Sequence, residues 1–270
     1  MAIVNVTPDS FYDGSRTPDE GALERRIAQV MAEGASIVDV GGYSSRPGAD
    51  PVPADEEWRR VERGLRAVRR LDGRAVVSVD TFRSEVAERA IEAFGPLIVN
   101  DISAGELDGR MASVVARYDV PYIAMHMKGD PQTMQSLTDY RRDIVTEVVS
   151  YFERRIERFA EAGIRRERLI LDPGFGFAKT LEQNYELLAG LDRLAALGLP
   201  VLAGLSRKSM IYRLLDTAPG EALAGTIALG WECLRQGATI LRVHDVREAV
   251  DTVRIFHTYR QNTALWQTKR

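Results

Sequence analysis

The chain has 270 residues, 45% of them hydrophobic and 28% charged, and 36 basic against 39 acidic side chains leave a net charge of −3. This length suits two small domains or one α/β barrel of about 250 residues, and the charge argues against nucleic-acid binding, which usually needs a basic excess. Cys233 is the only cysteine, so an intrachain disulfide is excluded and a reducing cytosol is favoured, while no apolar run is long enough to span a membrane.

Short apolar, β-branched runs alternate along the chain with longer segments of helical periodicity. Eight runs predict strands, at 3–4, 37–40, 75–79, 97–99, 122–125, 169–171, 201–205 and 240–243. The segments between them predict helices, the first with Thr17 as N-cap and Pro18 in its first turn. Eight strand–helix units predict one closed (β/α)8 TIM barrel over residues 1–270. The alternative is an open doubly wound sheet, which usually has fewer strands.

Polar residues follow almost every predicted strand. They are Asn5, Asp39, Asp80, Asn100 with Asp101, His126, Asp172, Ser206 to Lys208, and Arg242 with His244. In a TIM barrel the C-terminal strand ends form one rim that carries the chemistry. Asp, Asn and Ser also cap helices and turns, so a structural role remains open for each residue taken singly. Their coincidence on one rim favours a functional site.

Two kinds of side chain share this predicted rim. Asp80, Asn100 and Asp172 suit the polar edge of a planar ring, and cationic or donor groups suit phosphate; these are Arg46, Lys208, Arg242 and His244. Long loops at 5–16 and 41–53 could cover a substrate. The glycines of 171–180 lack the spacing of a nucleotide-binding loop, no serine-hydrolase elbow occurs, and the histidines lack metal-ligand spacing. A heterocycle joined to phosphates is the expected ligand.

Eight stretches resemble dihydropteroate synthases and follow the order of that family. They are NVTPDSF at Asn5, GGYSSRPGA at Gly41, SVDT at Ser78, VNDISAG at Val99, MHMKGDPQTMQ at Met125, LDPGFGFAKT at Leu171, GLSRKSMI at Gly204 and RVHDV at Arg242. The resemblance implies a transferase that joins 6-hydroxymethyl-7,8-dihydropterin pyrophosphate to p-aminobenzoate by an SN1-like, Mg²⁺-assisted reaction. It also implies a cytoplasmic homodimer that sulfonamides target.

The resemblance implies three groups of site residues. The pterin pocket would be Asp80, Asn100, Met125, Asp172 and Lys208, and the pyrophosphate site would be Asn5, Arg46, Arg242 and His244, with Asn5 also a magnesium ligand. The p-aminobenzoate pocket would involve Phe11, Ser45, Pro47, Phe177 and Ser209. Arg46, Lys208, Arg242 and His244 would be the catalytic residues. Ser45 stands where the family commonly has Thr, which leaves sulfonamide sensitivity open.

Two other functions are alternatives to this one. A pterin-binding methyltransferase barrel would share the Asp/Asn pocket, but its substrate would leave the cationic residues without a purpose. A non-catalytic relative acting as a binding or scaffold protein would be expected to have lost some of those cations, and all four are present.

Overall fold

The computed structural model describes residues 1–7, 20–44 and 51–267. Phe11, Ser45, Arg46 and Pro47 lie outside these ranges, as do Thr17 and Pro18 at the predicted helix start. The roles predicted for these residues therefore stay predictions.

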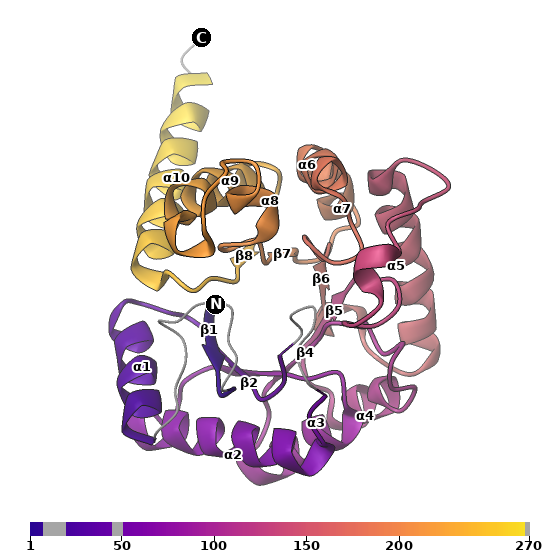
Figure 1. Cartoon of the computed structure of the whole chain (residues 1–270), viewed down its shortest axis with the longest axis vertical. Coiled ribbons are helices and arrows are strands. Elements are labelled where there is room, and N and C mark those ends of the chain that lie inside the picture. Colours follow the sequence, from indigo (N-terminus) through magenta and orange to yellow (C-terminus); the bar gives the residue numbers. More distant parts are fainter. Residues whose placement is uncertain (8–19, 45–50, 268–270) are drawn as a thin grey trace.

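Parallel strands form the centre of the molecule, and helices surround them (Figure 1). The strands pair in sequence order as a six-stranded sheet, β1 to β6, and a two-stranded sheet, β7 and β8. Their bounds are β1 Ala2–Asn5, β2 Val38–Gly41, β3 Val77–Asp80, β4 Ile98–Asp101, β5 Tyr122–Met125, β6 Leu169–Asp172, β7 Leu202–Ala203 and β8 Ile240–Leu241. Each strand overlaps one of the predicted apolar runs.

Single bridges between strands close the two sheets into a barrel. Leu171 pairs with Val201, and Ala2 pairs with Val243. The amide of Leu171 donates to Pro200 O at 2.9 Å, and that of Ile3 donates to Val243 O at 2.9 Å. The seventh and eighth predicted strands are longer than β7 and β8 because Val201 and Val243 take part only in these isolated bridges. The predicted TIM barrel is confirmed.

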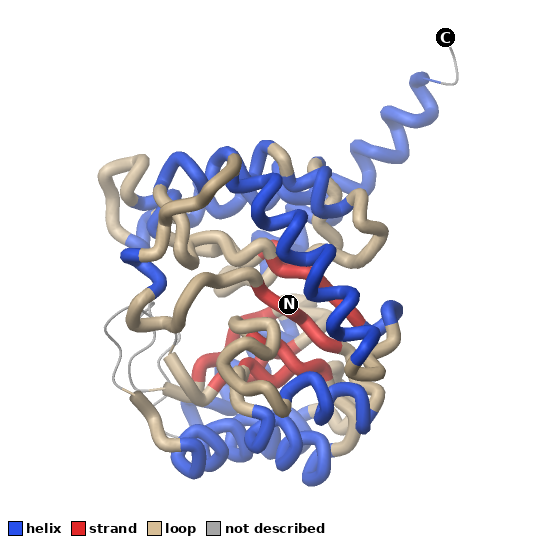
Figure 2. Tube along the Cα trace, turned by 90° about the vertical axis from the view of Figure 1, so that its right-hand side faces the viewer, coloured by secondary structure: helices blue, strands red, loops and turns tan. Residues whose placement is uncertain are grey.

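The helices follow the strands along the chain and cover the outside of the barrel. Their bounds are α1 Glu20–Ala32, α2 Ala54–Leu71, α3 Ser84–Phe94, α4 Met111–Tyr118, α5 Ile144–Glu161, α6 Leu181–Ala189, α7 Leu191–Ala195, α8 Ser209–Tyr212, α9 Leu223–Arg235 and α10 Val246–Gln267. Short 3₁₀ turns lie at Met134–Ser136, Arg166–Arg168 and Pro219–Glu221. The end of α10 projects beyond the barrel (Figure 2). None of the described helices combines the length and apolar character needed to cross a membrane.

Alternation along the strands separates the core from the site. Val38 and Val40 belong to the large core between strands and helices, so Asp39 between them points into the barrel. A second apolar cluster lies at the beginnings of the strands and is built on Ile98, Ile123 and Leu202. It fills the N-terminal part of the interior. The C-terminal part is left for polar side chains.

Candidate active site

Arg242 links carboxylates from two strands inside the barrel. Its Nε donates to Asp39 Oδ2 at 2.6 Å, and its Nη2 donates to Asp80 Oδ2 at 2.6 Å. Asn100 Nδ2 also donates to Asp39 Oδ2, at 3.2 Å. Strands β2, β3, β4 and the segment after β8 thus meet in one hydrogen-bonded network. The other oxygen of Asp39, Oδ1, is buried without a hydrogen-bond partner among the described residues.

The charges of this network depend on one another. Burial raises the pKa of Asp80, and the Arg242 guanidinium opposes that effect. Burial disfavours the charged form of Arg242, but the carboxylates of Asp39 and Asp80 outweigh it and raise the pKa of Arg242. The guanidinium therefore stays protonated. Its Nη1 makes no hydrogen bond to the described residues and remains available to a ligand.

Glycine provides the space that brings the polar side chains together. A Cβ atom at Gly41 would lie 3.4 Å from Asn5 Oδ1 and 3.6 Å from Asp80 Oδ2. At Gly204 a Cβ would lie 3.8 Å from Asp172 Oδ2 and 4.0 Å from Arg242 Cβ. Glycine at these two points lets side chains from β1, β3, β6 and the segment after β8 converge at the end of the barrel.

Asp172 ends β6 and is buried. Its Oδ1 accepts the N–H of Gly174 at 2.8 Å, which fixes the carboxylate against the following loop. Burial raises the pKa of Asp172, and Lys208 is the strongest of the groups that lower it. No ion pair within 4.0 Å is formed between Asp172 and the described cations. A donor-rich ligand can therefore find an acceptor at this carboxylate.

Lys208 approaches the same loop from the start of α8, where it is the N-cap residue. Its Nζ donates to Phe175 O and lies 4.4 Å from the centre of the Phe177 ring. Burial lowers the pKa of Lys208 to about 8, with Asp172 opposing the shift. The next residue, Ser209, begins α8. Lys208 therefore reaches the β6–α6 loop from the segment that precedes α8, and the role predicted for Ser209 stays a prediction.

His244 is held by the loop that carries Lys208. Its Nδ1 lies 3.1 Å from Ser206 Oγ, and its backbone N–H donates to the same oxygen at 3.2 Å. Burial, assisted by Arg242, lowers the pKa of His244 to about 3. The imidazole is therefore neutral and can act as a hydrogen-bonding group, one of the two possibilities the sequence left open.

Arg207 has a structural role. It adopts a left-handed backbone with φ of 55° and pairs with Asp245 through two hydrogen bonds of 2.8 Å. It also donates to Pro219 O and Gly220 O. This guanidinium joins the loops after β7 and β8 and thereby supports Lys208 and His244 on either side of it.

A methionine-rich apolar cluster forms the wall beside Asp172. Met125 packs there with Ile102, Met127 and Met134, and Phe177 lies against the cluster. Met125 is only 3% exposed. The cluster can therefore bound the flat face of a ring, as predicted for Met125, while also serving as ordinary core.

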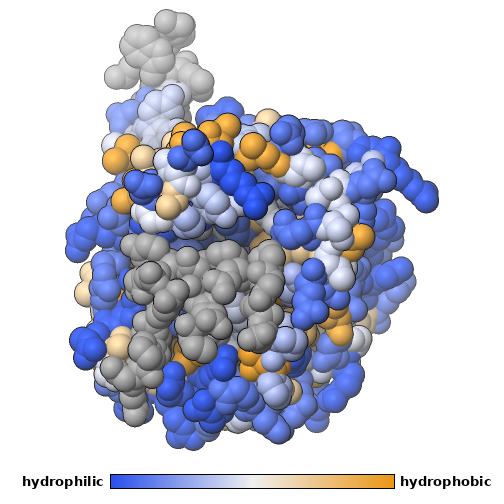
Figure 3. All heavy atoms as spheres, in the orientation of Figure 1, coloured by the Kyte–Doolittle hydropathy of each residue, from blue (hydrophilic) through white to orange (hydrophobic). Residues whose placement is uncertain are grey.

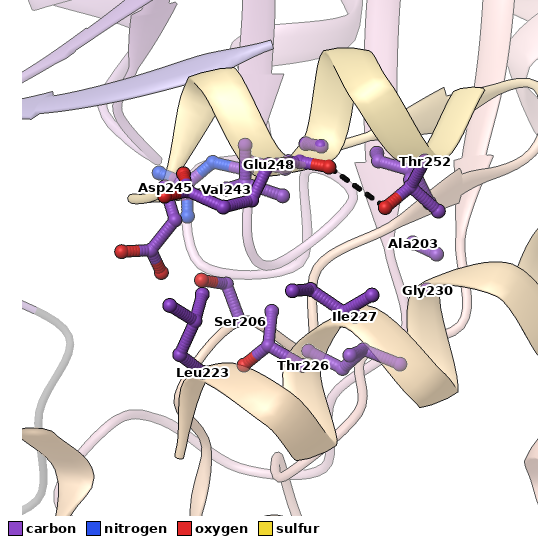
Figure 4. A pocket seen from close by; sticks show the side chains of 14 residues that line it. Ala203, Ser206, Leu223, Thr226, Ile227, Gly230, Val243, Asp245, Glu248 and Thr252 are labelled. Atoms are coloured by element: carbon purple, nitrogen blue, oxygen red, sulfur yellow. Dashed lines mark hydrogen bonds between the residues drawn. The ribbon is translucent and has the colours of Figure 1, made fainter. Parts of the chain in front are cut away.

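Two of the cavities among the described residues differ in size and lining. One, of about 20 Å³, lies between α9 and α10, where Ile227 and Thr226 face Glu248 and Thr252 (Figure 4). Thr252 Oγ1 there donates to Glu248 O at 2.7 Å, and the space is too small for a substrate. The other, of about 430 Å³, lies between α5 and the segment from Lys128 to Arg141.

The sequence missed two residues of this region. Asp39 was noted only as one of many polar strand ends, although it is the main partner of Arg242. Lys179 lies in the glycine-containing segment 171–180 and was given no role, although its side chain is buried and its pKa responds to Asp172. The signal that could have revealed both residues was a charged side chain within an apolar strand or a glycine-rich loop.

Comparisons with known proteins agree on one family. The family model described as "Pterin binding enzyme" matches residues 1–244. Dihydropteroate synthase of Escherichia coli (strain K12) is 43% identical over 256 residues, covering 94% of this chain and 89% of the relative. A Yersinia pestis dihydropteroate synthase with a sulfonamide drug complex has a TM-score of 0.91 at 38% identity, covering 96% and 93% of the two chains. A Xanthomonas albilineans dihydropteroate synthase in complex with 7,8-dihydropteroate has a TM-score of 0.83 at 37% identity, covering 96% and 92%.

The chain therefore belongs to the pterin binding enzyme family. Within that family it groups with the dihydropteroate synthases, and it is a transferase. The resemblance read from the sequence motifs is confirmed.

Proposed function

We propose that this chain joins 6-hydroxymethyl-7,8-dihydropterin pyrophosphate to p-aminobenzoate, giving 7,8-dihydropteroate and pyrophosphate. The observation that carries the proposal is the convergence of the buried Asp172 carboxylate with Lys208 and Arg242 at one end of the barrel. The structure of a related enzyme was solved in complex with 7,8-dihydropteroate, the compound proposed here as the product.

The pterin ring is assigned to the carboxylate side of the site. The 2-amino group and the adjacent ring N–H are two donors on one edge, and Asp172 offers acceptors for both. Asp80 and Asn100 line the neighbouring strand ends, and Met125 bounds the ring face. A buried site built around such acceptors discriminates strongly against rings that lack the donors.

The pyrophosphate is assigned to the donors around Arg242. Its Nη1 and the neutral imidazole of His244 can both donate to phosphate oxygens, and Arg46 and Asn5 complete the predicted set. An anion bound at His244 would favour its protonated form. Stabilising charge on the leaving group is the largest catalytic contribution that this arrangement offers.

The residues fit magnesium only as an ion shared with the substrate. Among the described residues no cluster of three or more His, Cys, Asp or Glu side chains could hold a metal. Asn5 Oδ1 supplies one oxygen near Asp80, and magnesium commonly takes few protein ligands together with phosphate and water. When bound there, magnesium would supply positive charge to the pyrophosphate.

The proposed reaction is an SN1-like substitution. The C–O bond between the pterin methylene and pyrophosphate breaks, and its electron pair leaves with pyrophosphate. The dihydropterin delocalises the positive charge, the arylamine nitrogen forms the new C–N bond, and the ammonium formed then loses a proton. An arylamine is neutral at pH 7, so a strong general base is not required. The protein's part is alignment and charge stabilisation.

The arylamine is assigned to the rim. Phe177 lies on the loop after β6 and Ser209 is the first residue of α8, and Phe11, Ser45 and Pro47 complete the predicted pocket. The Lys208 ammonium above the Phe177 ring is near enough to meet a carboxylate at this edge. Two of the loops that form the pocket are long, so it can assemble after the pterin has bound.

A cytosolic homodimer is proposed as the working state. Support comes from the single cysteine, which is buried, and from hydrophobic atoms that gather over α8, α9 and α10 (Figure 3). The large exposed apolar residues there are Leu214, Leu215, Ile227, Ile255 and Tyr259. An exposed apolar face of this kind suits a twofold interface with a second copy of the chain. Light scattering of wild type and Ile255→Glu tests it: a dimer that dissociates in the variant supports it, and a wild-type monomer contradicts it.

Product formation tests the proposed reaction. Wild-type protein with both substrates and magnesium should form dihydropteroate, measured by chromatography. Asp172→Asn should lose about 99% of kcat/KM, because a charged acceptor for the pterin is removed. Absence of dihydropteroate with the wild type, or full activity of the variant, would contradict the proposal.

A further inference from the structure

The loop between β6 and α6 has an unusual backbone that turns two carbonyl groups inward. Gly174, Gly176 and Ala178 have φ values of 70°, 80° and 50°, so every second residue is left-handed. Phe175 between them is fully buried, while Phe177 packs on the methionine cluster. A Cβ atom at Gly174 would overlap the carbonyl oxygen of His126. The loop is thus pressed tightly against the end of β5.

Lys179 lies near the end of this loop, and its amine is surrounded by hydrogen-bond acceptors. Its Nζ donates to Gly174 O at 2.9 Å and to Phe177 O at 2.9 Å, and it lies 3.0 Å from His126 Nδ1. The side chain is only 5% exposed. Burying a long cationic side chain is costly, and residues in this position usually have a specific role.

The contacts of Lys179 can survive a change of its charge. A protonated amine donates to both carbonyls and to His126 Nδ1. A neutral amine still donates to both carbonyls, and its lone pair accepts from His126 when the imidazole carries its proton on Nδ1. Burial lowers the pKa of Lys179 to about 7, and burial with Lys179 lowers the pKa of His126. The groups that bear on the amine are Asp172, which favours its charge, Lys208, which opposes it, and the neutral His126.

Both residues expected to hold the pterin depend on the loop that Lys179 fastens. Asp172 Oδ1 accepts the N–H of Gly174, whose carbonyl binds Lys179. Lys208 donates to Phe175 O and lies over Phe177, whose carbonyl binds Lys179. The Lys179 charge also lowers the pKa of Asp172, after the larger effects of Lys208, the Gly174 N–H and Arg242.

We propose that Lys179 is a positioning residue of the pterin site, which fastens the β6–α6 loop to His126 and thereby sets the position of Asp172 and Lys208. The inference rests on the proposed function only in taking Asp172 and Lys208 as pterin contacts. Lys179 itself reaches carbonyls and imidazole, so it acts on the ligand through these two neighbours.

Pterin binding without any chemistry provides the test. The probe is 6-hydroxymethylpterin, titrated by fluorescence between pH 5 and 9 against wild type, Lys179→Met and the control Leu194→Ala. Met keeps much of the side-chain volume but cannot donate, while Leu194 is a buried core residue of α7. Lys179→Met should weaken binding about tenfold at pH 8, because the variant loses the hydrogen bonds that fasten the loop, which a neutral amine still makes at that pH. The pH below which binding is lost should rise, because the pKa of Asp172 increases when the neighbouring Lys179 charge is removed. Leu194→Ala should keep the wild-type constant and profile.

A second variant covers the case in which Lys179→Met does not fold. His126→Phe keeps the ring that packs on Tyr140 and Tyr151 but removes the nitrogen that meets Lys179, and it should weaken binding in the same direction. The inference would be overturned if a folded Lys179→Met or His126→Phe variant bound pterin with wild-type affinity. It would also be overturned if Leu194→Ala lost as much pterin affinity as these variants. A wild-type protein that binds no pterin would instead contradict the proposed function.

Discussion

Arg242 and Asp39 are 203 positions apart, yet Arg242 Nε donates to Asp39 Oδ2 at 2.6 Å inside the barrel. Asp39 is fully buried and lies between two core valines of β2. The pair therefore fixes the guanidinium at the end of the barrel, where the pyrophosphate is proposed to bind. The same pair connects the carboxylate part of the site to its anion-binding part.

Asp39→Asn should damage both stability and catalysis. The amide keeps the size of the side chain but removes the charge that balances Arg242, and breaking a buried pair costs about 3 kcal/mol. We expect urea denaturation to show a loss of this size and kcat/KM to fall at least tenfold. Unchanged kcat/KM in the folded variant would mean that the pair supports the fold alone.

Asp172→Asn should separate function from stability. Burial raises the folded-state pKa of Asp172 above its ordinary value. The free energy of unfolding therefore falls as the pH rises from that ordinary value through the folded-state pKa, and a neutral amide avoids this loss. The amide oxygen can still accept the N–H of Gly174. We expect an unchanged or slightly higher free energy of unfolding at pH 7, with pterin affinity lowered about 100-fold. A large loss of stability would indicate a structural carboxylate instead.

Gly174→Ala should disrupt the β6–α6 loop more than Gly176→Ala. Both glycines are left-handed, which costs a substituted residue about 1–2 kcal/mol. At Gly174 the new methyl group would also overlap His126 O, a backbone atom, whereas at Gly176 it would lie 3.2 Å from the movable Cδ of Lys208. Thermal denaturation of the two variants should rank them in this order. The reverse order would show that the loop is not pressed against β5.

Lys179 should give the stability of the protein a particular pH dependence. Its pKa is about 7 in the folded chain against an ordinary value of 10.5, so between these values the unfolded chain binds one proton more. Stability must then rise with pH in this window, by about 1.4 kcal/mol per unit for one full proton. Lys179→Met lacks this contribution, so the difference between wild type and variant should grow from pH 7 to pH 10 in urea denaturation. A constant difference would place the pKa outside the window.

The positions of the strands and most of the rim could be predicted from the sequence. Apolar runs of two to five residues were sufficient to place β1 to β8, and the residues after them do converge, as Asp80, Asn100, Asp172 and Arg242 show. The reason is geometrical, since parallel strands of one barrel end on the same rim. The resemblance added the identity of the substrates.

Local sequence could not distinguish the roles of similar strand ends. Asp39 binds Arg242, whereas the equally buried Asp101 accepts from Ser103, Gly105 and Tyr122 and organises its own loop. The difference lies in which distant side chain each carboxylate meets. Lys179 was missed for a similar reason, because its acceptors depend on a left-handed backbone and on His126 from another strand.

Pyrophosphate release measured with and without p-aminobenzoate tests the central claim most directly. With both substrates and magnesium, the wild-type protein should release one pyrophosphate for each dihydropteroate formed, and omission of the arylamine should reduce release to a small fraction. Equal release in the absence of the arylamine would contradict the account, because the barrel end would then hydrolyse the diphosphate ester without transferring the pterin.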